Sequence, residues 1–77
     1  MLEFPKPVRQ ETLENGVYIS TVYDPERDFG DGYYFETAAF SFYDGKSDKL
    51  GKKLKCIHSD VEAEAIEAHE KLIRELA

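Results

Sequence analysis

Apolar and polar residues alternate over most of this chain, and the apolar spacing changes to three and four residues near the C-terminus. Two runs rich in aromatic and β-branched residues, 17–23 and 33–43, are the strongest strand signals, because such side chains suit a pleated, half-buried surface. Nine of the ten aromatic residues lie within 18–43. Shorter runs at 8–13 and 52–58 predict two further strands.

Turn-forming residues separate these runs. Asn15 and Gly16 both accept positive φ, and an Asn-Gly pair between two strand-like runs predicts a β-hairpin. The loop 24–32 combines a proline, two glycines and four acidic residues. Its acids do not have the spacing of an EF-hand, so we interpret it as a solvated loop rather than a cation site. Asp44 and Gly45 begin the next turn, which leads into a lysine-rich segment.

The longest run, 33–43, changes the parity of its large side chains. Tyr33 and Phe35 occupy odd positions, whereas Phe40 and Phe42 occupy even positions. Because alternation along a strand has a period of two, both groups can face one core only if an extra residue lies between them. The pattern therefore predicts a β-bulge or bend near 37–39.

The last strand-like run, 52–58, alternates lysines with apolar residues. We expect Leu54 and Cys56 to face the core and Lys53 and Lys55 to face solvent. Lysines on an exposed strand also discourage edge-to-edge aggregation.

A helix is predicted over 60–76. Ser59 and Glu62 match a capping box, in which each side chain bonds the other residue's backbone amide. Apolar residues then recur three and four positions apart, as expected for a helix with one buried face. This stripe consists of Ala65, Ile66, His69, Leu72, Ile73 and Leu76.

The order of these elements predicts an α+β fold: a four-stranded antiparallel β-meander with one C-terminal α-helix packed on one face. We expect a single domain over residues 1–77. Residues 1–7 are expected to form an extended N-terminal segment, because Pro5 and Pro7 have no amide hydrogen to donate.

Composition and charge narrow the class of protein. With 42% hydrophobic and 34% charged residues, the chain resembles a folded domain rather than a disordered one. It has no apolar run of bilayer length, no leader-like start, and one cysteine, Cys56, without an internal disulfide partner. We therefore expect a cytoplasmic protein. The net charge of -6 disfavours non-specific binding to nucleic acid, because phosphate would repel the molecule.

Several short motifs together resemble one family. They are the segment 17–23, the Phe29-Gly30 loop with Gly32, Phe35-Glu36-Thr37 with Phe40, and the helical segment 63–70 that ends in Ala-His-Glu. These motifs resemble a family of short uncharacterised phage and prophage proteins with V-S-T-V-aromatic, F-E-T-M-V-F and G-H-E patterns. The chain departs from that pattern at Ala38, Ala39 and Ala68, and its lysine-rich insert is longer. The resemblance implies an accessory protein of a phage or mobile element, in the host cytoplasm, and transfers no catalytic residue.

Side chains able to bind a metal or to act in acid-base catalysis are present. They are Glu36, Cys56, His58, His69 and Glu70. No C-x-x-C, H-E-x-x-H or paired-carboxylate spacing brings them together, so we expect no cofactor, no metal site and no enzymatic activity. We interpret His69 as a structural histidine and Cys56 as a small buried apolar residue. Glu36 either faces outward beside a lysine or hydroxyl, or is functional if it is buried and unpaired.

The expected function is binding to another protein. We expect a small non-enzymatic accessory protein that binds a host or phage protein, including as an inhibitor whose acidic helix mimics nucleic-acid charge. The alternative is a nucleic-acid-binding accessory protein that uses the hairpin 46–55, where five lysines outnumber one aspartate. Nucleic acid is the less favoured partner, because the rest of the molecule is acidic.

Self-association is also expected, as a symmetric homodimer. One helix can cover only part of so aromatic a sheet, and exposed aromatic patches commonly mark interfaces. The residues expected at interaction surfaces are Tyr18, Tyr34, Glu36, Phe42, Lys52 and Lys53.

Overall fold

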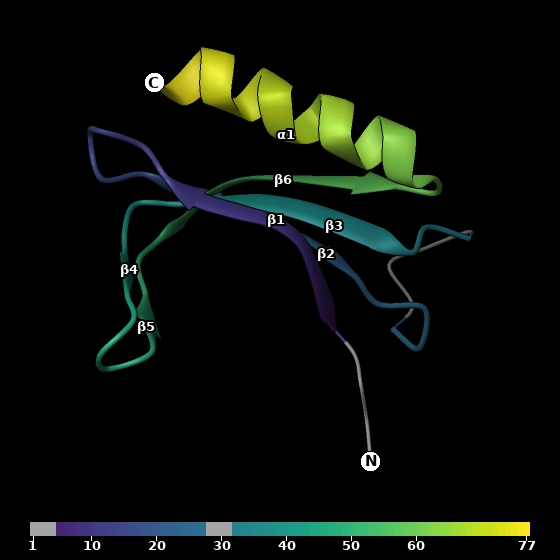
Figure 1. The fold of residues 1–77 in the computed structure, drawn as a ribbon, viewed down its shortest axis with the longest axis horizontal. Helices are drawn as coiled ribbons and strands as arrows, with labels where there is room; N and C mark the ends of the chain where they lie inside the picture. The colour runs from purple at the N-terminus through teal and green to yellow at the C-terminus, as the bar shows by residue number, and fades with distance from the viewer. Residues whose placement is uncertain (1–4, 28–31) are drawn as a thin grey trace.

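A computed structural model describes residues 5–27 and 32–77 of the chain. Residues 1–4, from the expected N-terminal segment, and residues 28–31, from the acidic loop, lie outside the described residues. The main sheet is antiparallel, with strands in the order β1-β2-β3-β6 (Figure 1). The elements are β1 (Lys6–Thr12), β2 (Tyr18–Tyr23), β3 (Phe35–Phe40), β4 (Tyr43–Asp44), β5 (Lys49–Leu50), β6 (Lys53–Ser59) and α1 (Glu62–Leu76). The predicted α+β fold is confirmed.

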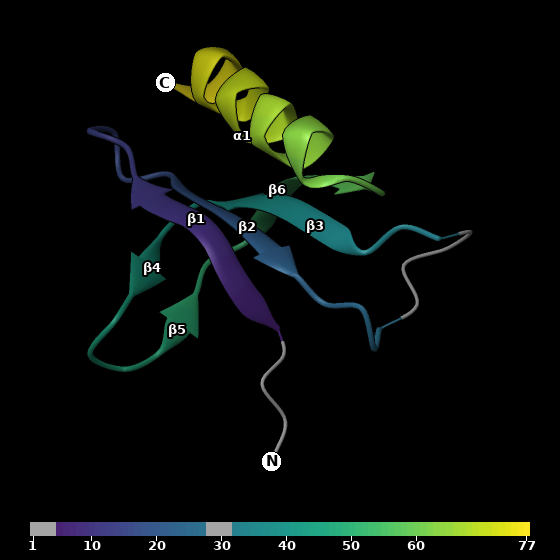
Figure 2. The ribbon, with the colours of Figure 1, turned by 45° about the vertical axis from the view of Figure 1, so that its right-hand side comes forward.

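The molecule has two layers and a protruding hairpin. Helix α1 lies across one face of the sheet, and the β4–β5 hairpin projects from the opposite side (Figures 1 and 2). We call the sheet face away from α1 the open face. In the described part of the chain, no helix combines the length and apolar character needed to cross a membrane.

The predicted hairpin around Asn15 and Gly16 is confirmed. Gly16 has a φ of 92°, and the Leu13 amide donates to the Val17 carbonyl at 2.8 Å. The Asn15 side chain accepts from the Val17 amide at 3.1 Å and donates to the Leu76 carbonyl at 2.7 Å. The turn therefore also holds the C-terminal end of α1. Strand β1 begins at Lys6, earlier than the expected position, so residues 6 and 7 belong to the sheet.

The bulge or bend predicted near 37–39 is corrected in its strand: a bulge lies beside that position, at Ala39 and Phe40, but the extra residue is on the partner strand. The register between β2 and β3 is continuous, and the shift lies between β3 and β6, where Leu54 is the extra residue on β6. Phe35 and Phe40 therefore face opposite sides of the sheet. Each has its own aromatic neighbour: Phe35 lies 4.9 Å from Tyr23 and Phe40 lies 6.4 Å from Tyr18, measured between ring centroids. Because aromatics pack on both faces, the strand needs no extra residue.

The expected facing of β6 is also wrong. Lys55 lies on the helix side, where its ammonium group is 3.2 Å from the Glu75 carboxylate of α1. Cys56 is exposed on the open face, and Leu54 is 42% exposed. The reason is the register, which places Ile57 opposite Thr37 and Lys55 opposite Ala39, on the face that α1 covers. At a sheet edge, the long lysine side chain can flank the core and keep its charge in water.

Helix α1 begins at Glu62 without the predicted capping box. Its N-cap residue is Val61, with no side-chain hydrogen bond. Ser59 is instead the last residue of β6 and is buried, and its carbonyl accepts a hydrogen bond from the Tyr34 amide at 3.1 Å. The sheet therefore uses the residue that the sequence assigns to the helix cap. The buried helix residues are Ala65, Ala68, His69 and Leu72. Ala68 was absent from the predicted stripe, and Ile66, Ile73 and Leu76 are only partly buried.

Part of the space between sheet and helix is polar. Ile19, Ala39 and Leu72 form the apolar core, beside a hydrogen-bonded chain through His69. The His69 Nδ1 atom lies 2.8 Å from the Thr21 hydroxyl, which lies 2.8 Å from the Thr37 hydroxyl. All three side chains are fully buried. The predicted position of His69, buried between helix and sheet, is confirmed.

Candidate functional site

The open face of the sheet contains a hollow of about 440 Å³. We call it the open-face hollow. Its floor is formed by small or medium side chains of β2 and β3, and its wall is formed by aromatic residues and the β4–β5 hairpin. Lining residues include Tyr18, Ser20, Val22, Asp24, Arg27, Glu36, Ala38, Phe40, Tyr43, Asp48 and Leu50. Of the six interaction residues that the sequence predicts, Tyr18 and Glu36 line this hollow.

Ring stacking holds the hairpin against the sheet and shapes the wall of the hollow. The Tyr18 and Tyr43 rings are stacked, with centroids 4.7 Å apart and an interplanar angle of 28°. The Tyr43 hydroxyl donates to the Asp48 carboxylate at 3.2 Å. Asp48 itself has a φ of 54°, so the hairpin turn places a non-glycine residue in the left-handed region. Leu50, on β5, leaves 49% of its surface exposed beside these rings.

The structure separates the predicted interaction residues into three groups. Tyr18, Glu36 and Lys53 lie at the open face, where Lys53 also approaches the Phe40 ring at 5.8 Å. Tyr34 is 44% exposed but lies beside the start of α1, together with Asp60 and Glu62.

Two further predicted residues lie where β3 passes into the hairpin. Phe42 is 48% exposed, and its carbonyl accepts from the Gly51 amide at 2.9 Å. The amide of Lys52 donates to the Ser41 hydroxyl at 3.0 Å. The six residues therefore do not form one continuous surface.

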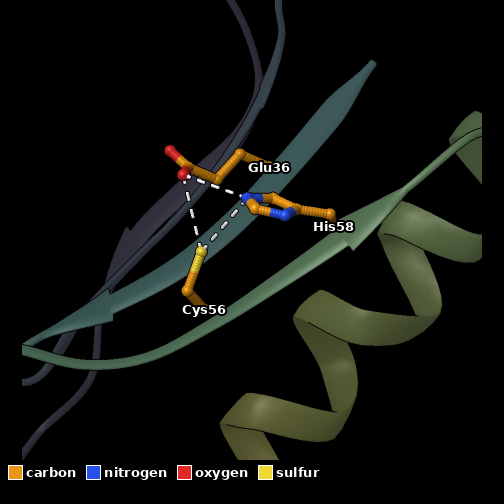
Figure 3. A group of neighbouring side chains, drawn as sticks. All are labelled: Glu36, Cys56 and His58. Atoms are coloured by element: carbon orange, nitrogen blue, oxygen red, sulfur yellow. Dashed lines mark hydrogen bonds and ion pairs between the residues drawn. The ribbon is translucent and has the colours of Figure 1, made fainter. Parts of the chain in front are cut away.

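Three potential ligand side chains meet on the open face, contrary to the expectation from spacing. Glu36 projects from β3, and Cys56 and His58 project from β6 (Figure 3). The Cys56 Sγ atom lies 3.4 Å from Glu36 Oε2 and 3.5 Å from His58 Nε2, and the latter lies 3.5 Å from Glu36 Oε2. We call these residues the Glu36–Cys56–His58 cluster.

The electrostatics of this cluster make its thiol a poor nucleophile. Partial burial, the charge of Glu36 and a hydrogen bond to the same carboxylate raise the pKa of the Cys56 thiol. At neutral pH the protonated thiol donates to Glu36, and the thiolate is the nucleophilic form. Lys53 supplies a positive charge 3.8 Å from Glu36 Oε2. The lysine partner expected for Glu36 is therefore present, whereas the expected burial of Cys56 is wrong.

Strand register brings the cluster together, and spacing along the chain does not reveal it. Cys56 and His58 share a face because they are two residues apart on one strand. Glu36 joins them because it lies directly opposite His58 in the antiparallel pair. The signal in the sequence is C-x-H in a predicted strand, together with an acid in the preceding strand. His69 lies on the helix side of the sheet and does not belong to this group.

Ion pairs engage two of the five lysines in the lysine-rich segment. Lys53 pairs with Glu36, and Lys55 pairs with Glu75 of the helix. Lys46, Lys49 and Lys52 are exposed in or beside the hairpin. Two of the five positive charges are therefore close to carboxylates, which weakens this segment as a phosphate-binding surface.

Comparisons with protein-family models, with curated proteins and with solved structures found no match to this chain. The resemblance to short phage and prophage proteins stays a prediction.

Proposed function

We propose that this protein is a non-enzymatic binding protein that holds a segment of another protein in the open-face hollow. The observation that carries this proposal is the hollow itself, with a floor of small side chains beside a partly exposed aromatic wall. Its volume of about 440 Å³ lies within the range of pockets that bind ligands. Such a shape suits one or two apolar side chains of a partner.

The charges around the hollow favour a basic partner. Asp24, Glu36 and Asp48 line it, whereas Arg27 is the one basic residue among its lining residues. The whole chain carries a net charge of -6, so a partner with lysine or arginine beside its apolar anchor is attracted at long range and favoured at the rim. The proposed occupant of the hollow is therefore a partner segment that is apolar at its centre and basic at its ends.

The resemblance to phage and prophage proteins supports a host or phage protein as the source of this segment. The acidic outer side of α1 supports the inhibitor form of the same proposal, because six acids outnumber two basic residues over 60–77. A second copy of the chain is the competing occupant. In that case the hollow would form the interface of the predicted homodimer.

Selection from a random peptide library against the immobilised protein tests the proposal. We expect the enriched peptides to share an apolar residue flanked by lysine or arginine. Leu50→Asp should weaken their binding at least about tenfold, because it places a charge in the hollow. The matched control is Leu54→Asp, a leucine of similar exposure on β6 outside the lining residues, which should retain binding.

Two results would contradict this proposal. One is equal loss of binding in both leucine variants. The other is a dimer by sedimentation at tens of micromolar that Leu50→Asp dissociates and Leu54→Asp does not, since a second copy would then occupy the hollow.

A further inference from the structure

We propose that Glu36, Cys56 and His58 form a mononuclear zinc site with one open coordination position. The site supplies one sulfur, one nitrogen and one oxygen ligand from the neighbouring strands β3 and β6 (Figure 3). This inference does not rest on the proposed function. Glu36 also lines the open-face hollow, but Cys56 and His58 do not, and the metal needs no occupant in the hollow.

The distances within the cluster match those of a tetrahedral site. Zinc bonds of about 2.3 Å to sulfur and about 2.0 to 2.2 Å to nitrogen and oxygen, at tetrahedral angles, separate the ligand atoms by about 3.4 to 3.6 Å. The three distances in the cluster are 3.4, 3.5 and 3.5 Å. A good N–H···O hydrogen bond is about 2.9 Å long. The 3.5 Å between His58 Nε2 and Glu36 Oε2 is longer than this and matches the separation of two zinc ligands.

The donor set selects zinc over the abundant hard cations. Thiolate and imidazole are zinc ligands, whereas Mg²⁺ and Ca²⁺ require oxygen donors in larger numbers. Zinc binding releases the thiol proton to water and leaves a thiolate bound to the metal. With three protein ligands, the fourth tetrahedral position remains for water or for a donor atom of another molecule.

Lys53 acts against the metal. Its ammonium group lies 3.8 Å from the same Glu36 oxygen that faces Cys56 and His58, and it is an exposed side chain. A bound cation and this ammonium group repel each other and compete for one carboxylate. Removing the lysine charge should therefore strengthen zinc binding, whereas removing any of the three ligands should weaken it.

Cobalt and zinc titrations of the full chain test the site. We expect one zinc ion per chain, measured against a chromogenic chelator, and no displacement by excess Mg²⁺. Cobalt in the same site should show tetrahedral d–d bands and a thiolate-to-cobalt charge-transfer band. Because Cys56 is the single cysteine of the chain, this charge-transfer band reports on one residue.

Matched variants separate metal binding from changes in folding. Glu36→Gln, Cys56→Ser and His58→Gln should each weaken zinc binding at least about tenfold, with circular dichroism unchanged. Glu75→Gln is the control, because Glu75 also holds a lysine ion pair but lies on α1. It should leave the affinity unchanged, and Lys53→Gln should increase it severalfold.

The proposal is overturned if the wild-type chain binds no stoichiometric zinc, or if Cys56→Ser retains the charge-transfer band. Equal weakening in Glu36→Gln and Glu75→Gln would also overturn it, since the effect would then reflect general charge. Loss of peptide binding in Leu50→Asp leaves these zinc measurements unaffected, so the two proposals fail independently.

Discussion

At the scale of single residues, His69 shows how a buried polar side chain is satisfied. Its Nε2 atom lies 2.8 Å from the Glu11 carboxylate, which can only accept, so Nε2 carries the proton and Nδ1 accepts from the Thr21 hydroxyl. Arg9 lies 2.9 Å from Glu11 and orients that carboxylate. Among the described residues that are not exposed, no buried side-chain polar atom lacks a hydrogen-bond partner. Replacing His69 should therefore lower the free energy of unfolding, because its buried partners lose their hydrogen bonds.

Replacing His69 with glutamine should destabilise the fold by about 1 to 3 kcal/mol, because the shorter amide cannot bond both Thr21 and Glu11 as the ring does. Urea unfolding measures this change. His58→Gln is the control, since His58 is exposed and its replacement should cost about 0.5 kcal/mol or less. If His69→Gln keeps the wild-type stability but loses peptide binding, the structural role is wrong.

The same histidine should make stability depend on pH. Burial lowers the pKa of His69, and the hydrogen bond from Nε2 to Glu11 opposes this shift; Arg9 lowers the pKa and Glu70 raises it. In the unfolded chain the pKa returns to about 6.5, so just below this pH the unfolded state binds more protons. The stabilisation that neutral His69 provides is complete above the unfolded-state pKa and is lost as the pH falls through the folded-state pKa. Urea midpoints should therefore fall between about pH 7.5 and pH 5.5, and less steeply in His69→Gln.

At the scale of elements, the β4–β5 hairpin depends on close contact at its base. A Cβ atom at Gly51 would lie 2.6 and 2.8 Å from two Phe42 ring atoms and would also clash with the Ser41 hydroxyl. That hydroxyl is held in place by the Lys52 amide. The glycine is required here by space, because its φ is not in the left-handed region.

Gly51→Ala should destabilise the protein by at least about 1 kcal/mol, because Ser41 and Phe42 must move to admit the methyl group. Amides of the hairpin should also exchange faster with solvent, as a sign that it detaches from the sheet. Gly45→Ala serves as the comparison, since its nearest contact is an ordinary 3.6 Å to the Tyr43 ring. Similar losses of stability in both variants would show that the packing at Gly51 is not the cause.

At the scale of the whole molecule, the chain is acidic apart from one small basic segment, the lysine-rich residues 46–55. The lysine-rich segment loses two of its five charges to pairing with Glu36 and Glu75. The remaining molecule is strongly acidic. The lysine-rich segment therefore attracts phosphate, whereas the molecule as a whole repels it. This charge distribution therefore supports the proposal of protein binding over the nucleic-acid alternative.

We expect no micromolar affinity for duplex DNA or for RNA at physiological salt, measured by gel shift. A clear shift would instead favour the nucleic-acid alternative. In that case, reversing Lys52 and Lys53 to glutamate should abolish binding and flatten its salt dependence. Reversing Lys71 and Arg74 on α1 makes the same charge change at another surface, and it should then have a smaller effect.

What the sequence determines by itself is the set of local elements. Alternating aromatic runs, the Asn15-Gly16 pair and the helical apolar spacing are short-range signals, and each led to an element that the structure contains. The run 33–43, expected as one strand, is divided between β3 and β4, which belong to different sheets. Single helix residues also follow from periodicity, as the burial of His69 does. The predicted capping box failed because the backbone of Ser59 is required by the sheet, a longer-range demand than a cap.

The tertiary structure alone decides which face each strand residue occupies. Alternation groups odd and even residues of one strand, but it does not say which group α1 covers or which residue of a neighbouring strand lies opposite. These choices reversed the expected facing of Lys55 and Cys56 and moved the bulge to Leu54. They also brought Glu36 to Cys56 and His58, because antiparallel register joins residues that are about twenty positions apart in the chain.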